Sequence, residues 1–126
     1  MVFGIGMDCI EVARIEARVS EDSAFAGKIF TPREREYCAG RHHPAQHYAA
    51  RFAAKEALFK ALGTGWSGGM AFHEVEVLND DNGRPCLILS GAVRAFAAHH
   101  DIARMHVSLT HVRELACAVV VLETGK

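Results

Sequence analysis

Long hydrophobic runs are missing from this chain of 126 residues. The longest ones, such as residues 116–122, fall far short of the roughly 20 apolar residues that a membrane-spanning helix needs. The apolar start, residues 1–10, lacks the basic flank and cleavage pattern of a signal peptide and contains Asp8. We therefore expect a cytoplasmic protein without a membrane span. The length fits one domain, so residues 1–126 should fold as a single unit.

Closely spaced cysteines are also missing. The four cysteines, Cys9, Cys38, Cys86 and Cys117, form no Cys-x-x-Cys pair, and each stands in an apolar or helical context. This spacing does not favour a disulfide framework or a zinc site, least of all in a cytoplasmic protein. We therefore expect buried free thiols.

A strong excess of one charge is absent too. Fourteen Lys and Arg stand against fifteen Asp and Glu, which gives a formal net charge of −1. Residues 11–60 are slightly basic, with nine basic and seven acidic side chains. An excess of two does not support nucleic-acid binding. The basic side chains of residues 11–60 belong either to an ordinary solvated surface or to a local basic face that binds an acidic protein partner or a polyphosphate.

Turn and cap signals divide the N-terminal half into short elements. Residues 2–7 form an apolar run typical of a strand, and apolar residues at helical spacing follow over 12–19. Thr31 can cap a helix that has proline at its first position, Glu34 at its third and Gly40 at its end. The sequence thus predicts a strand that leads into helices.

The longest predicted helix begins at Pro44 and runs through an alanine-rich stretch to Leu62, with Gly63 as its C-terminal cap. A loop with four glycines in seven positions follows over residues 63–69, where the backbone can approach a ligand closely. This loop follows a helix and contains no Gly-Lys-Ser or Gly-Lys-Thr, which excludes a Walker phosphate-binding loop.

The C-terminal half is richer in strand patterns. Residues 72–77 and 85–89 flank an Asp-Asp-Asn-Gly turn and predict a β-hairpin. Ser90 can cap a short helix, after which residues 105–109 and 115–122 predict two further strands. This order of elements favours an α+β fold with antiparallel pairing over a regular parallel β-α-β fold.

Charged residues gather on the long helix and near the end of the first strand. Phe52, Glu56, Phe59 and Lys60 share one helical face. A solvated Glu56–Lys60 pair is the simpler interpretation, although the aromatic flanks predict partial burial, where a charged pair is costly unless it binds something. Asp8 either caps the next helix or acts as a metal or proton ligand. If the two carboxylates converge beside the lysine, they would suit Mg²⁺ and a substrate phosphate.

Two motifs carry a specific resemblance to a known family. Gly6-Met7-Asp8 and the Phe-Ala-Ala-Lys-Glu-Ala-Leu-Phe-Lys-Ala run over residues 52–61 resemble the paired signature of the phosphopantetheinyl transferase superfamily. Gly63-Thr64-Gly65, Gly83-Arg84-Pro85 and Ser108-Leu109-Thr110-His111 are similar to its short acyl-carrier-protein synthase branch. The likeness covers nearly the whole chain. It implies an α+β fold in which an antiparallel sheet packs with one long helix and shorter helices.

The resemblance also implies roles for individual residues. Asp8 and Glu56 would be Mg²⁺ ligands, and Glu56 and Lys60 would act in catalysis, with Lys60 near the phosphates. Arg14 and Arg18 of the first helix would face the acidic helix of a carrier protein. The residues implied to border coenzyme A are Lys60, Gly63, Thr64, Gly65, Pro85 and His111. Six other histidines match no motif and are expected to be surface or structural residues: His42, His43, His47, His99, His100 and His106.

The implied activity is the transfer of 4'-phosphopantetheine from coenzyme A to a serine of apo acyl carrier protein in fatty-acid biosynthesis, with release of adenosine 3',5'-bisphosphate. A homotrimer with active sites between subunits is implied as well. Two other classes stay open. A catalytically silent module that binds coenzyme A or a carrier would not need Asp8, Glu56 and Lys60 together, and a hot-dog-like thioesterase would not need Lys55-Glu56 followed by Lys60.

Overall fold

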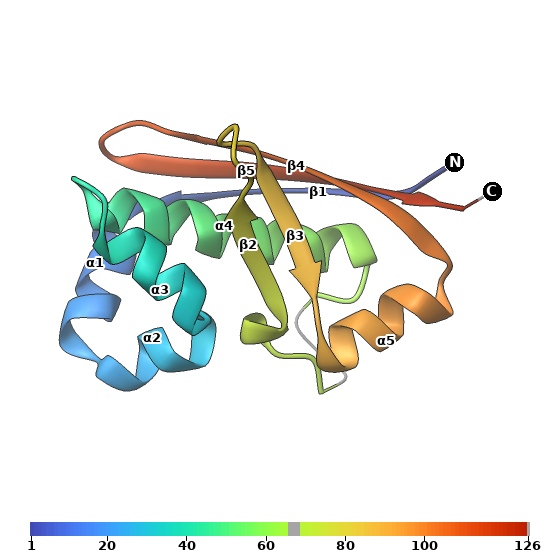
Figure 1. Ribbon diagram of the computed structural model, residues 1–126, viewed down its shortest axis with the longest axis horizontal. Coiled ribbons are helices and arrows are strands. Elements are labelled where there is room, and N and C mark those ends of the chain that lie inside the picture. Colours follow the sequence, from blue (N-terminus) through green and yellow to red (C-terminus); the bar gives the residue numbers. More distant parts are fainter. Residues whose placement is uncertain (66–68, 126) are drawn as a thin grey trace.

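The computed structural model describes residues 1–65 and 69–125, and it has the predicted α+β architecture with antiparallel sheets (Figure 1). Part of the predicted glycine loop, Trp66 to Gly68, lies outside the described residues. In chain order the elements are β1 (Val2–Glu11), α1 (Val12–Glu21), α2 (Ser23–Ile29), α3 (Pro32–Ala39), α4 (Pro44–Leu62), the 3-10 turn η1 (Phe72–Glu74), β2 (Val75–Asn79), β3 (Pro85–Leu89), α5 (Gly91–His99), β4 (Ile102–His111) and β5 (Leu115–Thr124).

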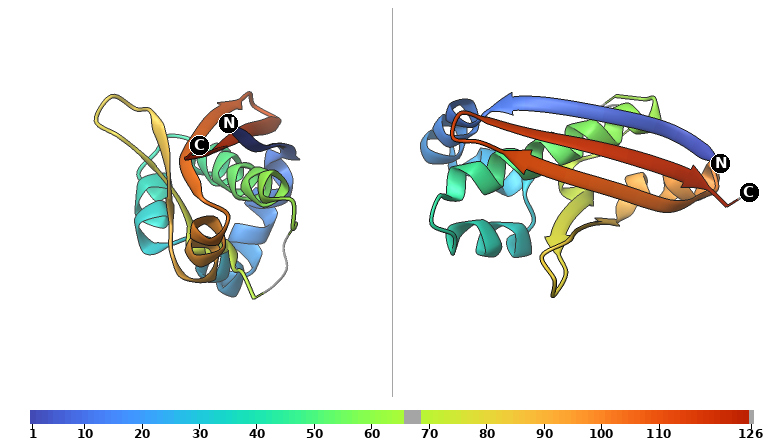
Figure 2. Two further views of the ribbon diagram at one scale, coloured as in Figure 1. Left: turned by 90° about the vertical axis from the view of Figure 1, so that its right-hand side faces the viewer. Right: turned by 90° about the horizontal axis from the view of Figure 1, so that it is seen from above.

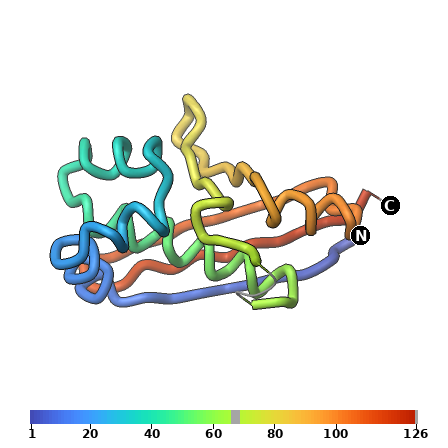
Figure 3. Tube along the Cα trace, turned by 90° about the horizontal axis from the view of Figure 1, so that it is seen from below, coloured from blue at the N-terminus to red at the C-terminus, as the bar shows by residue number. Residues whose placement is uncertain are grey.

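The main sheet has the strand order β1-β5-β4, with both pairs antiparallel. The long helix α4 runs along one face of this sheet, and in the view from above no other described helix or strand covers the opposite face (Figure 2). The β2–β3 hairpin and the shorter helices lie on the far side of α4 (Figure 3). The helix is therefore a central layer with packing partners on two sides.

Two glycines allow β1 to pack directly on α4. A Cβ atom at Gly4 would overlap with the carbonyl oxygen of Ala61, and one at Gly6 would overlap with the carbonyl oxygen of Ala57. Both glycines lie on the same side of the strand because side chains alternate along it. Asp8 follows on that side, so the backbone contact brings its carboxylate next to α4.

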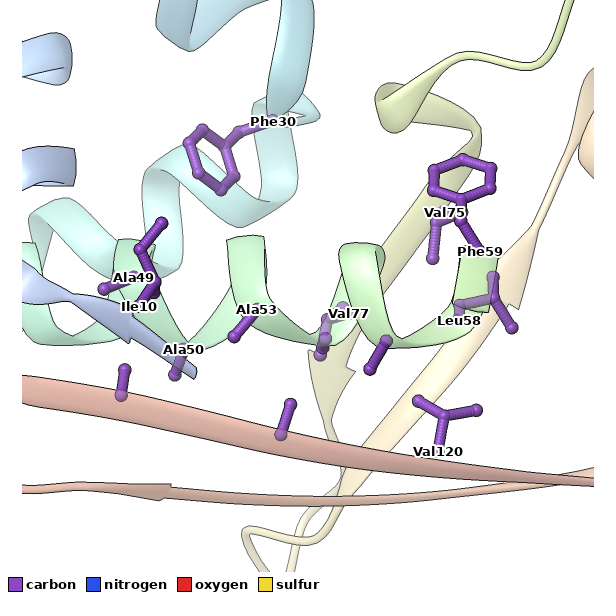
Figure 4. Packing of buried hydrophobic residues seen from close by; sticks show 14 of the residues in the cluster. Ile10, Phe30, Ala49, Ala50, Ala53, Leu58, Phe59, Val75, Val77 and Val120 are labelled. Atoms are coloured by element: carbon purple, nitrogen blue, oxygen red, sulfur yellow. The ribbon is translucent and has the colours of Figure 1, made fainter. Parts of the chain in front are cut away.

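The core surrounds α4, most of whose 19 residues are buried. Figure 4 shows Val120 of β5 on one side of this helix and Phe30 with Val75 on the other. Small residues such as Ala53 let the sheet pack close to the helix. A helix in a central layer needs apolar side chains on more than one face, and α4 has them. The alanine-rich run of the sequence is therefore explained by packing on both sides.

Several predicted boundaries need correction. β1 continues to Glu11, so Asp8 lies within the strand, and α1 has Glu11 at its N-cap position; the helix-cap interpretation of Asp8 is therefore wrong. The capping box of Thr31 and Glu34 is confirmed. Ser90 makes no side-chain cap.

Among the described residues, no helix combines the length and apolar character that a membrane span needs.

The cysteines are free, as predicted, but their predicted burial is wrong for three of the four. Cys38 is buried, whereas Cys9 and Cys86 are exposed and Cys117 is partly buried. Cys9 and Cys117 occupy the outward positions of β1 and β5, on the sheet face opposite α4 that the other described elements leave uncovered. The apolar sequence context did not show whether each thiol would point toward the core or away from it.

Candidate active site

Asp8 and Lys60 meet where β1 crosses the C-terminal half of α4. The Lys60 ammonium donates hydrogen bonds to the Asp8 carboxylate at 3.1 Å and to the Met7 carbonyl oxygen at 3.0 Å. The Lys60 side chain is 52% exposed and that of Asp8 is 18% exposed. Within the described residues Lys60 is paired with Asp8 and not with Glu56, so the solvated Glu56–Lys60 pair is not the arrangement that the helix adopts.

Glu56 stands one turn before Lys60 on α4 and is partly buried. Burial raises the pKa of Glu56, the Asp8 carboxylate raises it further, and Lys60 opposes both effects. The influence of Asp8 shows that the two carboxylates act on each other electrostatically. A bound cation would relieve this repulsion.

The donor set fits a magnesium ion. Hard carboxylate oxygens are the ligands that Mg²⁺ prefers, usually one or two from the protein, with water and substrate phosphates at the other positions. Among the residues that the structure describes, no group of three or more His, Cys, Asp or Glu side chains is placed to hold a metal. The carboxylates of Asp8 and Glu56 would match the number and type of protein ligands that a phosphate-bound Mg²⁺ takes.

A sharp turn follows directly after these side chains. Gly63 ends α4 in the left-handed conformation, with φ of 81°, and its N–H donates to the Lys60 carbonyl oxygen at 3.0 Å. Gly65 also has a positive φ of 59°, which favours glycine, and the Thr64 hydroxyl donates to its carbonyl oxygen at 2.7 Å. The predicted turn at Gly63 to Gly65 is therefore present beside Lys60.

Pro85 and His111 lie together in a different place. They line a cavity of about 170 Å³ between α4, the β2–β3 hairpin and β4. The His111 ring stands 5.4 Å from the His47 ring, and Arg51 is buried with its guanidinium 4.1 Å above the Tyr37 ring. This cavity carries basic and aromatic side chains.

His47 and Arg51 are two basic residues of this cavity to which the sequence analysis assigned no role at the site. Burial lowers the pKa of His47, and the neighbouring His111 and Arg51 side chains lower it further. Such an electropositive environment would attract an anionic group. Their spacing of four residues on α4 places both on one helical face, which is the signal that could have identified them.

The two groups of side chains do not meet within one chain. Asp8 pairs with Ala118 from one side of the central strand β5, while His111 pairs with Ala116 from the other side. The structure therefore brings Asp8, Glu56 and Lys60 together but leaves Pro85 and His111 across the sheet from them.

Arg14 and Arg18 are both exposed on α1, four residues apart. The Arg18 guanidinium lies 4.5 Å from the centre of the Phe25 ring of α2. This cation–π contact holds Arg18 over the neighbouring helix. Both basic side chains are thus accessible, and Arg18 has a defined position.

A family model described as the 4'-phosphopantetheinyl transferase superfamily matches residues 4–120. The chain belongs to the 4'-phosphopantetheinyl transferase superfamily. A relative from Geotalea daltonii, named holo-[acyl-carrier-protein] synthase, is 43% identical over 124 residues, which are 98% of this chain and 99% of the relative. The predicted family, the α+β fold and the transferase class are therefore confirmed.

Solved structures of the phosphopantetheinyl transferases agree with this assignment. A holo-[acyl-carrier-protein] synthase from Neisseria meningitidis superposes with a TM-score of 0.89 at 34% identity, over 98% of this chain and 100% of that one. One from Bacillus anthracis, solved in complex with CoA (3',5'-ADP), gives a TM-score of 0.82 at 39% identity, over 99% of each chain.

Proposed function

We propose that this chain transfers the 4'-phosphopantetheine group of coenzyme A to a serine hydroxyl of an apo acyl carrier protein in fatty-acid biosynthesis. The observation that carries the proposal is the convergence of Asp8 and Lys60, from two elements far apart in sequence, beside the partly buried Glu56. These three residues belong to the two motifs of the family. The relatives named holo-[acyl-carrier-protein] synthase support the choice of substrates.

Asp8 and Glu56 hold Mg²⁺ in this proposal. When bound, the ion supplies positive charge that stabilises the negative charge developing on the transferred phosphoryl oxygens. The two carboxylates are brought close by the glycine contacts of β1 with α4, and their mutual repulsion is relieved by the ion.

Lys60 contributes a second positive charge at the phosphate. An ammonium group has three N–H donors, and the described residues engage two of them, through the Met7 carbonyl and the Asp8 carboxylate. The remaining donor can bind a phosphoryl oxygen. Since Lys60 is tethered at Met7 and Asp8, its charge is positioned before the substrate arrives, which is the kind of electrostatic preorganisation that lowers a barrier.

Glu56 accepts the proton of the attacking serine, directly or through a water molecule. The serine oxygen forms a bond to the β-phosphorus of coenzyme A, and the bond from that phosphorus to the leaving adenosine 3',5'-bisphosphate breaks. The product is a phosphodiester on the carrier serine.

The coenzyme A site is completed by a second subunit in this proposal. Pro85 and His111 cannot reach the Asp8 group of their own chain, because β5 lies between them. The uncovered face of the main sheet carries Ile5 and Met7, which are 66% and 68% exposed, as an interface between subunits requires. A homotrimer in the cytoplasm, with active sites at the subunit interfaces, fits both observations, and the free thiols fit a reducing compartment.

Mass spectrometry of the carrier protein tests the activity. The chain is incubated with coenzyme A, Mg²⁺ and apo acyl carrier protein, and the carrier is then weighed. A gain of one phosphopantetheine group is expected, and it should be lost when the carrier serine is replaced by alanine. A silent binding module would form a complex without any mass gain, and a thioesterase would hydrolyse acyl-coenzyme A instead; either result would refute the proposal.

A further inference from the structure

His47 lines the cavity of about 170 Å³ and packs there between two other rings. The centre of its ring lies 5.4 Å from that of His111 on β4 and 5.8 Å from that of Tyr37 on α3. Both contacts are edge-to-face, with interplanar angles of 67° and 75°. The two neighbouring rings thus fix the place of the His47 imidazole in the wall of the cavity.

Arg51 brings a hydrogen-bond donor without a partner to the same cavity. The residue is 1% exposed, and its Nη2 donates to the side-chain oxygen of Asn79 at 2.7 Å. Its Nε is buried and has no hydrogen-bond partner among the described residues. A buried N–H that stays unpaired costs free energy, which a bound acceptor would recover. Since no acidic side chain is among the described residues that line the cavity, it suits an anion with several acceptor oxygens, such as a phosphate group.

The charge of His47 depends on what occupies this cavity. Burial lowers the pKa of His47 below its ordinary value of 6.5, and the neighbouring His111, Arg51, Arg41 and His43 side chains lower it further. These neighbours stand around the ring on β4, on α4 and in the turn that precedes α4. The neutral imidazole is therefore favoured at neutral pH in the free protein. An anion in the cavity would oppose the effect of the basic neighbours and favour the protonated ring.

We propose that His47 binds a phosphate group of coenzyme A and takes up a proton from solvent when it does so. The imidazole nitrogen that gains the proton donates a hydrogen bond to a phosphate oxygen, and no covalent bond of the coenzyme forms or breaks. Hydrogen bonds between ionised partners are shorter and stronger than neutral ones. This role of His47 rests on the proposed function, which assigns the cavity of Pro85 and His111 to the coenzyme A site.

Proton uptake makes the binding of coenzyme A depend on pH. Because the proton and coenzyme A favour each other's binding, the affinity that His47 contributes should rise as the pH falls toward the raised pKa of the complex. The phosphate groups also gain protons in this range, since the second pKa of a phosphate monoester is about 6. The part due to His47 is therefore the difference between the wild type and a variant that lacks the ionisable ring.

The test is isothermal titration calorimetry of coenzyme A with the wild type and with His47→Phe, in the presence of Mg²⁺ and without carrier protein. Phenylalanine can still pack between Tyr37 and His111. Measurement in two buffers of different ionisation enthalpy counts the protons taken up at about pH 7, and the wild type should take up more than the variant. The Kd of the variant should be about three- to tenfold higher at about pH 6.5, with a difference that shrinks toward about pH 8.5.

His99→Phe is the matched control, because His99 is exposed on α5 and does not line the cavity. It should take up protons and bind coenzyme A like the wild type. Dephospho-coenzyme A, which lacks the 3'-phosphate, identifies the phosphate that is bound. The difference between the wild type and His47→Phe should vanish with this ligand if the 3'-phosphate occupies the cavity, and it should persist if the diphosphate does.

NMR titration of the His47 ring in the wild type, with and without coenzyme A, gives a readout that needs no altered cavity. The pKa of His47 should be higher in the complex. An unchanged pKa, or proton uptake and Kd values that are the same for the wild type and His47→Phe, would overturn the role of His47 and leave the proposed transferase activity standing. A wild type that does not bind coenzyme A would overturn both.

Discussion

The Lys60 ammonium lies 3.1 Å from the Asp8 carboxylate, although 52 residues separate the two in the chain. The contact exists because β1 packs on α4 through Gly4 and Gly6, with no side chain between the two backbones. The catalytic arrangement proposed above therefore depends on a backbone contact as much as on the charged residues themselves.

Replacing Gly6 by alanine tests this dependence. The added methyl group would overlap with the Ala57 carbonyl oxygen and force β1 away from α4. We expect Gly6→Ala to lower the free energy of unfolding by about 1–3 kcal/mol, as overpacking does, and to reduce activity more than stability alone explains. The measurements are urea unfolding and the initial rate of carrier modification.

Gly27→Ala is the matched control for this glycine variant. A Cβ atom at Gly27 would meet nothing within 4 Å, and the residue lies inside α2. Alanine should be neutral there or stabilise the helix by about 0.5–1 kcal/mol. Equal losses of stability in the two variants would contradict the role given to the contact of β1 with α4.

Glu56 gives a prediction about stability and pH. Its pKa is raised above the ordinary value of 4.5, mainly by burial and then by Asp8, so folding favours the protonated form. The free energy of unfolding should therefore fall as the pH rises from this ordinary value through the raised pKa. Without metal at pH 7, Glu56→Gln should unfold at a higher urea concentration than the wild type, and the difference should shrink below the ordinary pKa of Glu56.

Magnesium should reverse this order, because only the wild type has both carboxylate ligands. Its unfolding midpoint should rise with added Mg²⁺, and that of Glu56→Gln should change little. Glu36→Gln, at an exposed position of α3, is the control and should respond to Mg²⁺ like the wild type. A metal-free Glu56→Gln that is less stable than the wild type at pH 7 would contradict the electrostatic account.

The sequence predicted the parts of the site that lie in local patterns. Helical spacing placed Glu56 and Lys60 on one face, and the left-handed cap at Gly63 followed from glycine after a helix. The contact of Lys60 with Asp8 and the grouping of Pro85 with His111 depend on how distant elements pack. No local pattern contains that information.

Lys55 shows the same limit within the most specific motif. It is fully buried, and its ammonium donates to the Glu34 carboxylate at 2.7 Å and to the Val75 carbonyl oxygen at 2.5 Å. Glu34 was predicted only as part of a helix cap, yet it also accepts a hydrogen bond from the Val77 N–H at 2.8 Å. The pair thus connects α3, α4 and β2. Helical periodicity does not reveal a partner from another helix.

Removing the Lys55 charge should therefore destabilise the fold. Lys55→Met would leave the buried Glu34 carboxylate without its cation, and such losses cost about 3–5 kcal/mol. Urea unfolding measures the effect. The double variant Lys55→Met/Glu34→Gln should lose less than the sum of the two single variants, because it removes the unpaired charge. Strict additivity would contradict a direct pairing.

The carrier-binding role of Arg14 and Arg18 can be separated from coenzyme A binding. Reversing both to Glu should raise the KM for the carrier at least about tenfold, roughly 1.4 kcal/mol, with a much smaller change for coenzyme A. Added salt should weaken carrier binding by the wild type in the same direction, since exposed charges are screened.

Arg94→Glu is the control for this charge reversal. Arg94 is exposed on α5, which lies at the opposite end of the molecule from α1 (Figure 1). Its reversal should leave the KM for the carrier close to that of the wild type. Because Arg18 also contacts the Phe25 ring, the unfolding midpoint of the double variant is measured alongside. If neither the double reversal nor added salt changes the KM for the carrier, the docking surface lies elsewhere on the protein.

The most direct test of the proposed site is the rate of carrier modification by Glu56→Gln at limiting Mg²⁺, measured by mass spectrometry with Glu36→Gln as the control. The amide keeps the shape of the side chain but removes its charge and its capacity to take the serine proton. We expect kcat/KM to fall at least about 100-fold, with a folded protein and little rescue by excess Mg²⁺. A Glu56→Gln enzyme that retains near wild-type turnover at limiting Mg²⁺ would contradict the assignment of Glu56 as metal ligand and base.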